Sequence, residues 1–192
     1  MARDADYYLV VDLEATCDDG GAMPRDQTEI IEIGAVLVEG KTLRTVAELM
    51  TFVRPIVHPV LTAFCTQLTT ITQDMVDPAP GFPAAAARLA AFGQGALFCS
   101  WGNYDRNQLA QDAQRHGIPP PLGPDHWNLK EAFAETGGTK RRGLGVFAAL
   151  RKIGLPPLGT HHRGIDDARN IARLLPYVLG RGPTAEAGPP GR

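Results

Sequence analysis

Residues 7–14 read Tyr-Tyr-Leu-Val-Val-Asp-Leu-Glu, a β-favouring apolar run that ends in two carboxylates, Asp12 and Glu14. Side chains two positions apart in a strand share one face, so both carboxylates point one way while Leu13 points the other. Two like charges held side by side repel each other unless a cation lies between them. The pattern therefore predicts either a site for a hard metal ion or a solvent-exposed strand end.

Around this run the chain alternates between strand-like and helix-like segments. We expect further strands over 30–38, 46–53 and 97–100 and near Trp127, and helices over 82–92, 105–116, 130–135, 144–153 and 165–179. Three early strands followed by alternating strands and helices indicate an α/β fold.

The composition is that of an ordinary globular chain, with 192 residues, 44% of them hydrophobic and 21% charged. We expect a single domain over residues 1–179 and a flexible, Gly- and Pro-rich tail over 180–192. The formal charge of −2 gives no global positive field for binding long nucleic acid. Cations bound at a carboxylate cluster would still supply positive potential locally, so a nucleic-acid enzyme is not excluded.

Cysteine usage and hydropathy bear on the cellular compartment. Cys17, Cys65 and Cys99 are odd in number and form no Cys-x-x-Cys pair, which disfavours a disulfide framework and a structural zinc site. The sequence has no apolar run of about 18 residues, and its start lacks the apolar stretch of a signal peptide. We expect a cytoplasmic protein without membrane contact.

Two later segments add acidic candidates. Asp105 falls in the first turn of an expected helix, where an acid also serves simply to complement the helix dipole. In the last expected helix, Asp167 lies about 90° from the centre of the apolar stripe, whereas Asp166 points away from it. Asp167 is therefore the inward candidate, and Asp166 is interpreted as an N-terminal helix charge.

His162 precedes Asp167 by five positions, which would place the two about 140° apart on one continuous helix. They converge only if His162 lies in the loop before the helix, a break that Gly164 permits. The alternative is a capping or surface histidine.

These three segments resemble the exonuclease motifs of the DEDDh family of 3′→5′ exonucleases. Asp12 and Glu14 match the first motif's Asp-x-Glu, Asp105 matches the second motif's Asp, and His162 with Asp167 match His-x-x-x-x-Asp. The resemblance covers about residues 7–179 and is closest to the exoribonucleases that trim histone mRNA and small RNAs. Further matching stretches are residues 12–17, 29–33, 52–55, 68–72 and 166–173. It implies a ribonuclease H-like α/β fold with a mixed central five-stranded sheet flanked by helices.

The resemblance also implies hydrolysis of phosphodiesters with two metal ions. Asp12, Glu14, Asp105 and Asp167 would hold two Mg²⁺ or Mn²⁺ ions, which prefer such hard oxygen ligands, and Asp12 would bridge them. His162 would be the general base, because a histidine titrates close to working pH.

Four residues are candidate substrate contacts: Leu13, Leu68, Trp101 and Tyr104. Leu68 resembles a position where relatives wedge an apolar side chain against the terminal bases, although core packing explains it equally well. Trp101 and Tyr104 offer aromatic faces on which a base would stack, unless Trp101 is buried.

Two basic segments are candidate phosphate contacts. Residues 140–142, Lys-Arg-Arg, and Arg163 beside the expected base have the required charge. A solvated surface explains such a charge run equally well.

The leading hypothesis is an exoribonuclease that removes nucleoside monophosphates from the 3′ end of single-stranded, short RNA. The sequence offers no long basic track, and we expect no additional nucleic-acid-binding segment like that of the eukaryotic relatives. A DNA-directed exonuclease of proofreading type is the first alternative. An inactive nucleic-acid-binding module is the second alternative. Such a module typically lacks one of the catalytic carboxylates or the histidine, whereas all five motif residues are present here.

Overall fold

The run that carries Asp12 and Glu14 forms the central strand of a five-stranded sheet with the order β3-β2-β1-β4-β5. The computed structural model describes residues 3–137 and 143–182. Its strands are β1 (Tyr7–Ala15), β2 (Ile30–Glu39), β3 (Thr45–Phe52), β4 (Leu97–Ser100) and β5 (His126–Asn128). β1, β2 and β3 form an antiparallel meander, and β4 and β5 continue the sheet in parallel with β1. The expected mixed sheet is confirmed.

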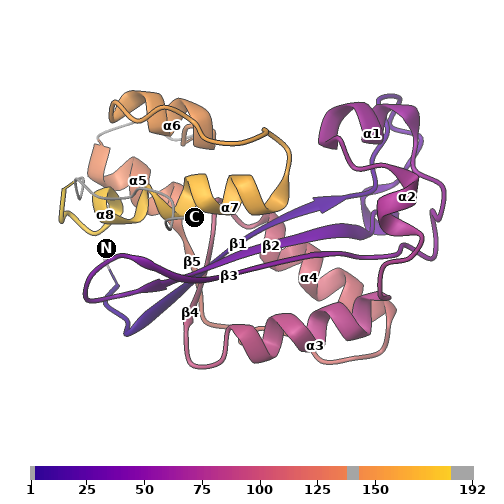
Figure 1. Ribbon diagram of the computed structural model, residues 1–192, viewed down its shortest axis with the longest axis horizontal. Helices are drawn as coiled ribbons and strands as arrows, with labels where there is room; N and C mark the ends of the chain where they lie inside the picture. Colours follow the sequence, from indigo (N-terminus) through magenta and orange to yellow (C-terminus); the bar gives the residue numbers. More distant parts are fainter. Residues whose placement is uncertain (1–2, 138–142, 183–192) are drawn as a thin grey trace.

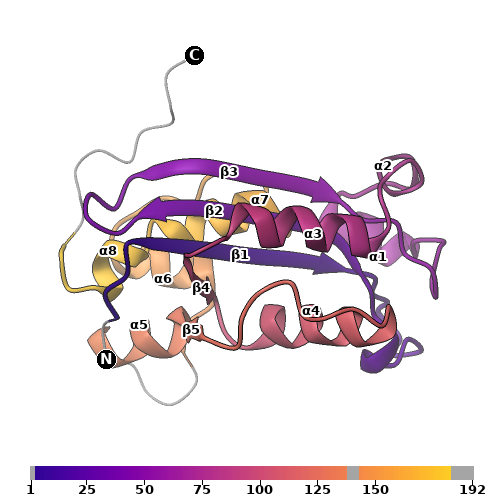
Figure 2. The same ribbon diagram turned by 90° about the horizontal axis from the view of Figure 1, so that it is seen from below.

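Helices cover both faces of the sheet (Figures 1 and 2). They are α1 (Ala63–Thr69), α2 (Gln73–Val76), α3 (Phe82–Phe92), α4 (Tyr104–Arg115), α5 (Leu129–Gly137), α6 (Val146–Lys152), α7 (Gly164–Ala172) and α8 (Leu175–Val178), with a 3₁₀ turn, η1, at Arg25–Gln27. One core packs α5 to α8 against the sheet, and a second core packs α3 and α4 against the opposite face. α1 and α2 lie at the end toward which β1 runs.

The alternation of side chains along β1 sorts its residues between these two cores. Tyr8 and Val10 belong to the core under α7, whereas Leu9, Val11 and Leu13 belong to the core under α3 and α4. Asp12 and Glu14 have the parity of Tyr8 and Val10 and therefore continue the α7 face.

The expected helix over 165–179 is wrong as one continuous element. α7 ends at Ala172 and α8 begins at Leu175, with Pro176 in its first turn. Proline lacks the N–H that would bond to the carbonyl of Ala172, and its ring clashes with that carbonyl, so the helix cannot run through.

α1 and α2, which have seven and four residues, are not among the helices expected from the sequence. Both helices are too short for apolar residues to show a helical periodicity in the sequence, and α1 depends instead on an N-terminal cap. Thr62 Oγ1 accepts the Cys65 N–H at 2.9 Å and donates to the Cys17 carbonyl at 2.6 Å. This threonine therefore ties the start of α1 to the loop after β1.

α7 approaches β2 at a pair of glycines. A Cβ at Gly34 would overlap the backbone of Gly164, and one at Gly164 would crowd the Asp12 carbonyl oxygen at 3.0 Å. The missing side chains let the start of α7 rest directly on the sheet beside β1. Within the described residues, no helix has the length and hydropathy needed to cross a membrane.

Candidate active site

Three carboxylates from two elements meet at the junction of β1 and α7. Asp12, Glu14 and Asp167 each bring one carboxylate oxygen to within 4.8 Å of the others. Asp12 and Glu14 are partly buried, whereas Asp167 is buried in the first turn of α7, as expected from its helical position, and Asp166 is more exposed. The spacing of these oxygens suits a shared cation.

Asp167 uses only one of its oxygens within the described structure. Oδ2 accepts the backbone N–H of His162 at 2.9 Å, whereas Oδ1 is buried without a hydrogen-bond partner among the described residues. A buried, unsatisfied polar group costs about 1 to 3 kcal/mol. A cation at this position would satisfy Oδ1, so the residues present fit a metal site.

Asp105, on α4, lies near enough to the cluster for its charge to raise the pKa of Asp12, although it is not one of the three carboxylates whose oxygens lie within 4.8 Å of one another. β1 pairs with β4 only over Tyr8 to Val10. Farther along β1, the Leu13 N–H donates to Asp105 Oδ1 at 3.1 Å. Burial raises the pKa of Asp105 to about 6, against the opposing effect of hydrogen bonds that include those from Leu13 and Ser100. The fourth carboxylate is thus held by the backbone of the strand that carries the first two.

The carboxylates perturb one another strongly. Burial, followed by repulsion from Asp105 and Glu14, raises the pKa of Asp12 well above its ordinary value. Burial and the charge of Asp167 raise the pKa of Glu14 to about 8, and burial raises that of Asp167. Burial and mutual repulsion thus favour the protonated carboxyls, and a bound cation would displace such protons.

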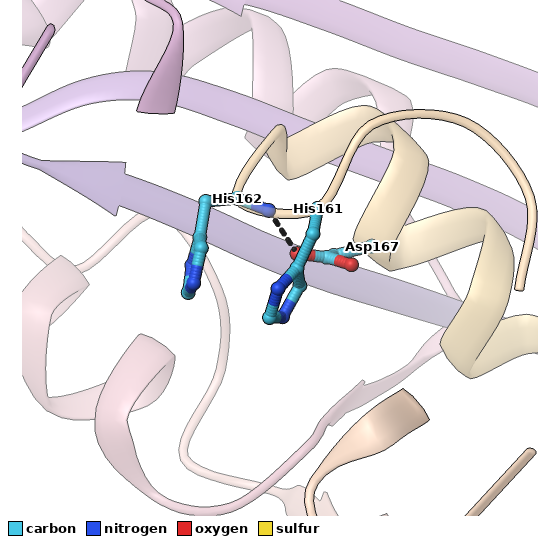
Figure 3. A group of neighbouring side chains, drawn as sticks. All are labelled: His161, His162 and Asp167. Atoms are coloured by element: carbon cyan, nitrogen blue, oxygen red, sulfur yellow. Dashed lines mark hydrogen bonds between the residues drawn. The ribbon is translucent and has the colours of Figure 1, made fainter. Parts of the chain in front are cut away.

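His162 lies in the turn before α7, which confirms the condition set by its spacing from Asp167. Its φ of +61° places it in the left-handed region, and α7 begins two residues later. Figure 3 shows its ring beside that of His161, with centroids 3.8 Å apart and the Asp167 carboxylate next to them. Burial, with the neighbouring His161, lowers the pKa of His162, which favours the neutral imidazole that a general base requires.

Glu32 is a residue that the sequence reasoning missed. It is fully buried on β2, directly opposite Glu14 in the strand register. Its carboxylate pairs with the Arg163 guanidinium at 3.1 Å and accepts the Gly164 N–H at 3.0 Å. The acid that interrupts the apolar run over 30–38 was the available signal for a buried polar contact.

Arg163 makes its charged and aromatic contacts within the protein. Besides its pairing with Glu32, its guanidinium lies 5.4 Å from the centroid of the Phe52 ring. The pairing with Glu32 anchors the start of α7 to the sheet and neutralises the charge that was expected to contact phosphate. The basic run 140–142 lies outside the described residues.

The candidate substrate contacts separate by exposure. Tyr104 is 53% exposed and Leu68 is 37% exposed, so both present apolar surface to solvent. Trp101 is partly buried, donates from Nε1 to the Leu144 carbonyl at 2.9 Å and packs on Phe133. The Leu13 side chain is 4% exposed in the core beneath α3 and α4, so it offers almost no surface to a substrate.

Comparisons with known proteins agree with this geometry. Residues 9–175 match the RNase T family model, which is described as an exonuclease family. Human ERI1 exoribonuclease 3 is 33% identical over 187 residues, covering 92% of this chain and 54% of that protein. Human 3′-5′ exoribonuclease 1 is 30% identical over 184 residues, covering 91% and 52%. The chain thus spans about half the length of these relatives.

Solved structures extend the likeness to three dimensions. The nuclease domain of 3′hExo, described as a DEDDh family member bound to rAMP, has a TM-score of 0.86 and 29% identity, and the match covers 95% of this chain and 96% of that domain. A 3′-exonuclease solved for its recognition of the histone mRNA stem-loop has the same TM-score and 28% identity, with 93% of this chain and 65% of that chain covered.

Proposed function

Because this chain belongs to the RNase T exonuclease family, in its DEDDh branch near the ERI1 exoribonucleases, we propose that it is a 3′→5′ exoribonuclease. Its substrate would be the 3′ end of single-stranded, short RNA, and its products nucleoside monophosphates. The observation that carries the proposal is the buried Asp167 Oδ1 beside Asp12 and Glu14, which has no hydrogen-bond partner among the residues that the structure describes. The 3′hExo nuclease domain, which this chain matches almost end to end, binds rAMP, a ribonucleoside monophosphate.

The family implies divalent metal ions, and we assign them to Asp12, Glu14, Asp105 and Asp167. Four carboxylates form a hard-oxygen site that suits two Mg²⁺ or Mn²⁺ ions. When bound, such ions neutralise charge on the phosphate and lower the pKa of water. Asp105 is oriented by the Leu13 N–H, and Asp167 by the His162 N–H, so both carboxylates are positioned before any ion arrives.

Side chains of the protein would transfer the proton and bind the substrate. His162, whose lowered pKa favours the neutral form and which lies beside Asp167, would accept the proton of the attacking water. Tyr104, exposed at the start of the helix that carries Asp105, would stack on a base near the 3′ end, a contact that contributes about 1 to 3 kcal/mol. The exposed side of Leu68 would pack against the terminal bases.

The test is an exonuclease assay on 5′-labelled, single-stranded RNA and DNA of matched sequence and several lengths. We expect stepwise shortening from the 3′ end with Mg²⁺ or Mn²⁺, faster on RNA than on DNA. Asp12→Asn is the inactive control. Cleavage that persists in excess chelator or in this variant would refute metal-dependent hydrolysis, and a preference for DNA would favour the proofreading alternative.

A further inference from the structure

Beside the carboxylate cluster lies a second group of metal-ligating side chains, of different chemistry. His161, His162 and Asp167 each bring one ligand atom to within 4.8 Å of the others. Figure 3 shows both imidazoles projecting in the same direction from the turn before α7, with the Asp167 carboxylate close to them. His161 is exposed, so an ion can reach this group from solvent.

The donor set matches a borderline metal better than a hard one. Imidazole nitrogen and carboxylate oxygen are ordinary ligands of Zn²⁺, and open zinc sites use three protein ligands and leave one position for water. Mg²⁺ prefers an all-oxygen shell. Asp167 is only 5% exposed, and its Oδ1 lacks a hydrogen-bond partner among the described residues, which is a second indication that a cation belongs beside this group.

We propose that His161, His162 and Asp167 form a zinc site that inhibits the enzyme when it is filled. The two ligand sets share Asp167, and a nitrogen of His162 that binds Zn²⁺ cannot accept a proton. A filled zinc site and an active carboxylate site therefore exclude one another. The inhibition rests on the proposed function, whereas the zinc binding does not.

The stacking around His161 provides a matched variant. Its ring lies between Phe147, at 4.1 Å between centroids, and His162, at 3.8 Å. In His161→Phe, an aromatic ring remains in this stack but the ligand nitrogens are gone. Asp12→Asn is the complementary control, because it weakens the carboxylate cluster and leaves His161, His162 and Asp167 intact.

The binding experiment titrates Zn²⁺ into metal-free protein by calorimetry. His161→Phe should weaken the Zn²⁺ affinity at least about tenfold. Removing a residue that only supports a metal ligand already lowers metal affinity by about 10- to 100-fold, and His161 is itself a ligand in this proposal. Asp12→Asn should keep the wild-type affinity. Equal Zn²⁺ affinity in wild type and His161→Phe, or a loss confined to Asp12→Asn, would place the ion on the β1 carboxylates and overturn the proposal. His161→Gln repeats the test if the Phe variant fails to fold.

The inhibition experiment follows nuclease activity at fixed Mg²⁺ while Zn²⁺ is added. The activity of each protein is expressed relative to its own activity without Zn²⁺, and half-inhibition of His161→Phe should need at least about tenfold more Zn²⁺ than half-inhibition of the wild type. Unchanged sensitivity to Zn²⁺ would contradict the inhibitory role. If the wild-type protein shows no nuclease activity, the proposed function fails, and calorimetry still decides whether the zinc site exists.

Discussion

At the scale of single residues, the backbone of His162 positions Asp167, whereas its side chain is the proposed general base. Its backbone N–H donates to Asp167 Oδ2, a bond that does not involve the imidazole and that we expect His162→Ala to keep. Loss of the imidazole should lower kcat by about 10²- to 10⁴-fold, the usual contribution of a general base. Mn²⁺ binding should stay near wild type, which calorimetry checks. Near-normal turnover in this variant would rule out the proposed base.

Glu14 predicts a pH dependence for the metal-free protein. Its pKa rises from 4.5 in the unfolded chain to about 8 in the fold, so the folded protein holds this proton more tightly. The resulting stability is fully present below pH 4.5 and is lost as the pH rises toward 8. The free energy of unfolding in chelator should therefore fall across this window.

Urea titrations at several pH values measure the effect. Glu14→Gln should flatten the decline, because the amide cannot ionise, and saturating Mg²⁺ should also reduce it by stabilising the charged form. A pH profile that is equally steep in wild type and Glu14→Gln would assign the decline to other groups.

The Glu32–Arg163 ion pair anchors the start of α7 to β2, so a single residue here determines how two elements pack. Arg163→Met leaves the fully buried Glu32 carboxylate without its cation. Breaking a buried pair costs about 3 to 5 kcal/mol, and we expect the lower end because the Gly164 N–H remains. Adding Glu32→Gln to this variant should recover most of the loss. Denaturant unfolding of both proteins is the measurement, and a double variant no more stable than the single one would contradict the explanation.

At the scale of elements, the contact between α7 and β2 needs glycine. Gly34→Ala would push a methyl group into the backbone of Gly164 and move the turn that carries His162. Overpacking of this kind costs about 1 to 3 kcal/mol. We expect that loss in unfolding experiments, with a fall in nuclease activity even where the variant is fully folded. Gly123→Ala, whose added Cβ has no described atom within 4 Å, is the control.

The same elements show how far local sequence patterns reach. All five strands were predicted, and the signal was clearest in the apolar runs of β1 and β2, which are buried on both faces. The spacing of Asp167 and His162 correctly predicted a turn before α7. The break before Pro176 was missed, because the apolar periodicity continues through it and only one proline opposes a continuous helix. The short helix α1 was missed as well. α1 depends on the hydrogen bond from Thr62 to the Cys17 carbonyl, a contact between residues distant in sequence that no local pattern contains.

At the scale of the whole molecule, the site forms where layers from both faces of the sheet meet. Asp12 and Glu14 come from β1, Asp105 from α4 on one side and Asp167 from α7 on the other. The parity of β1 predicted that the first two share a face. The Leu13 N–H that holds Asp105, and the buried Glu32 opposite Glu14, depend on strand neighbours distant in sequence and emerge only from the folded sheet.

This arrangement predicts that metal binding stabilises the entire fold. A cation held by β1, α4 and α7 links three elements and relieves the repulsion among their carboxylates, and it has no equivalent site in the unfolded chain. A ligand at 100 times its dissociation constant adds about 2.7 kcal/mol. Mn²⁺ should therefore raise the Tm, and chelator should lower it. The increase should vanish in Asp12→Asn and Asp167→Asn, while Asp166→Asn, altered one position away on the same helix, should keep it. An equal rise in all of these proteins would mean that the ion stabilises them from another site.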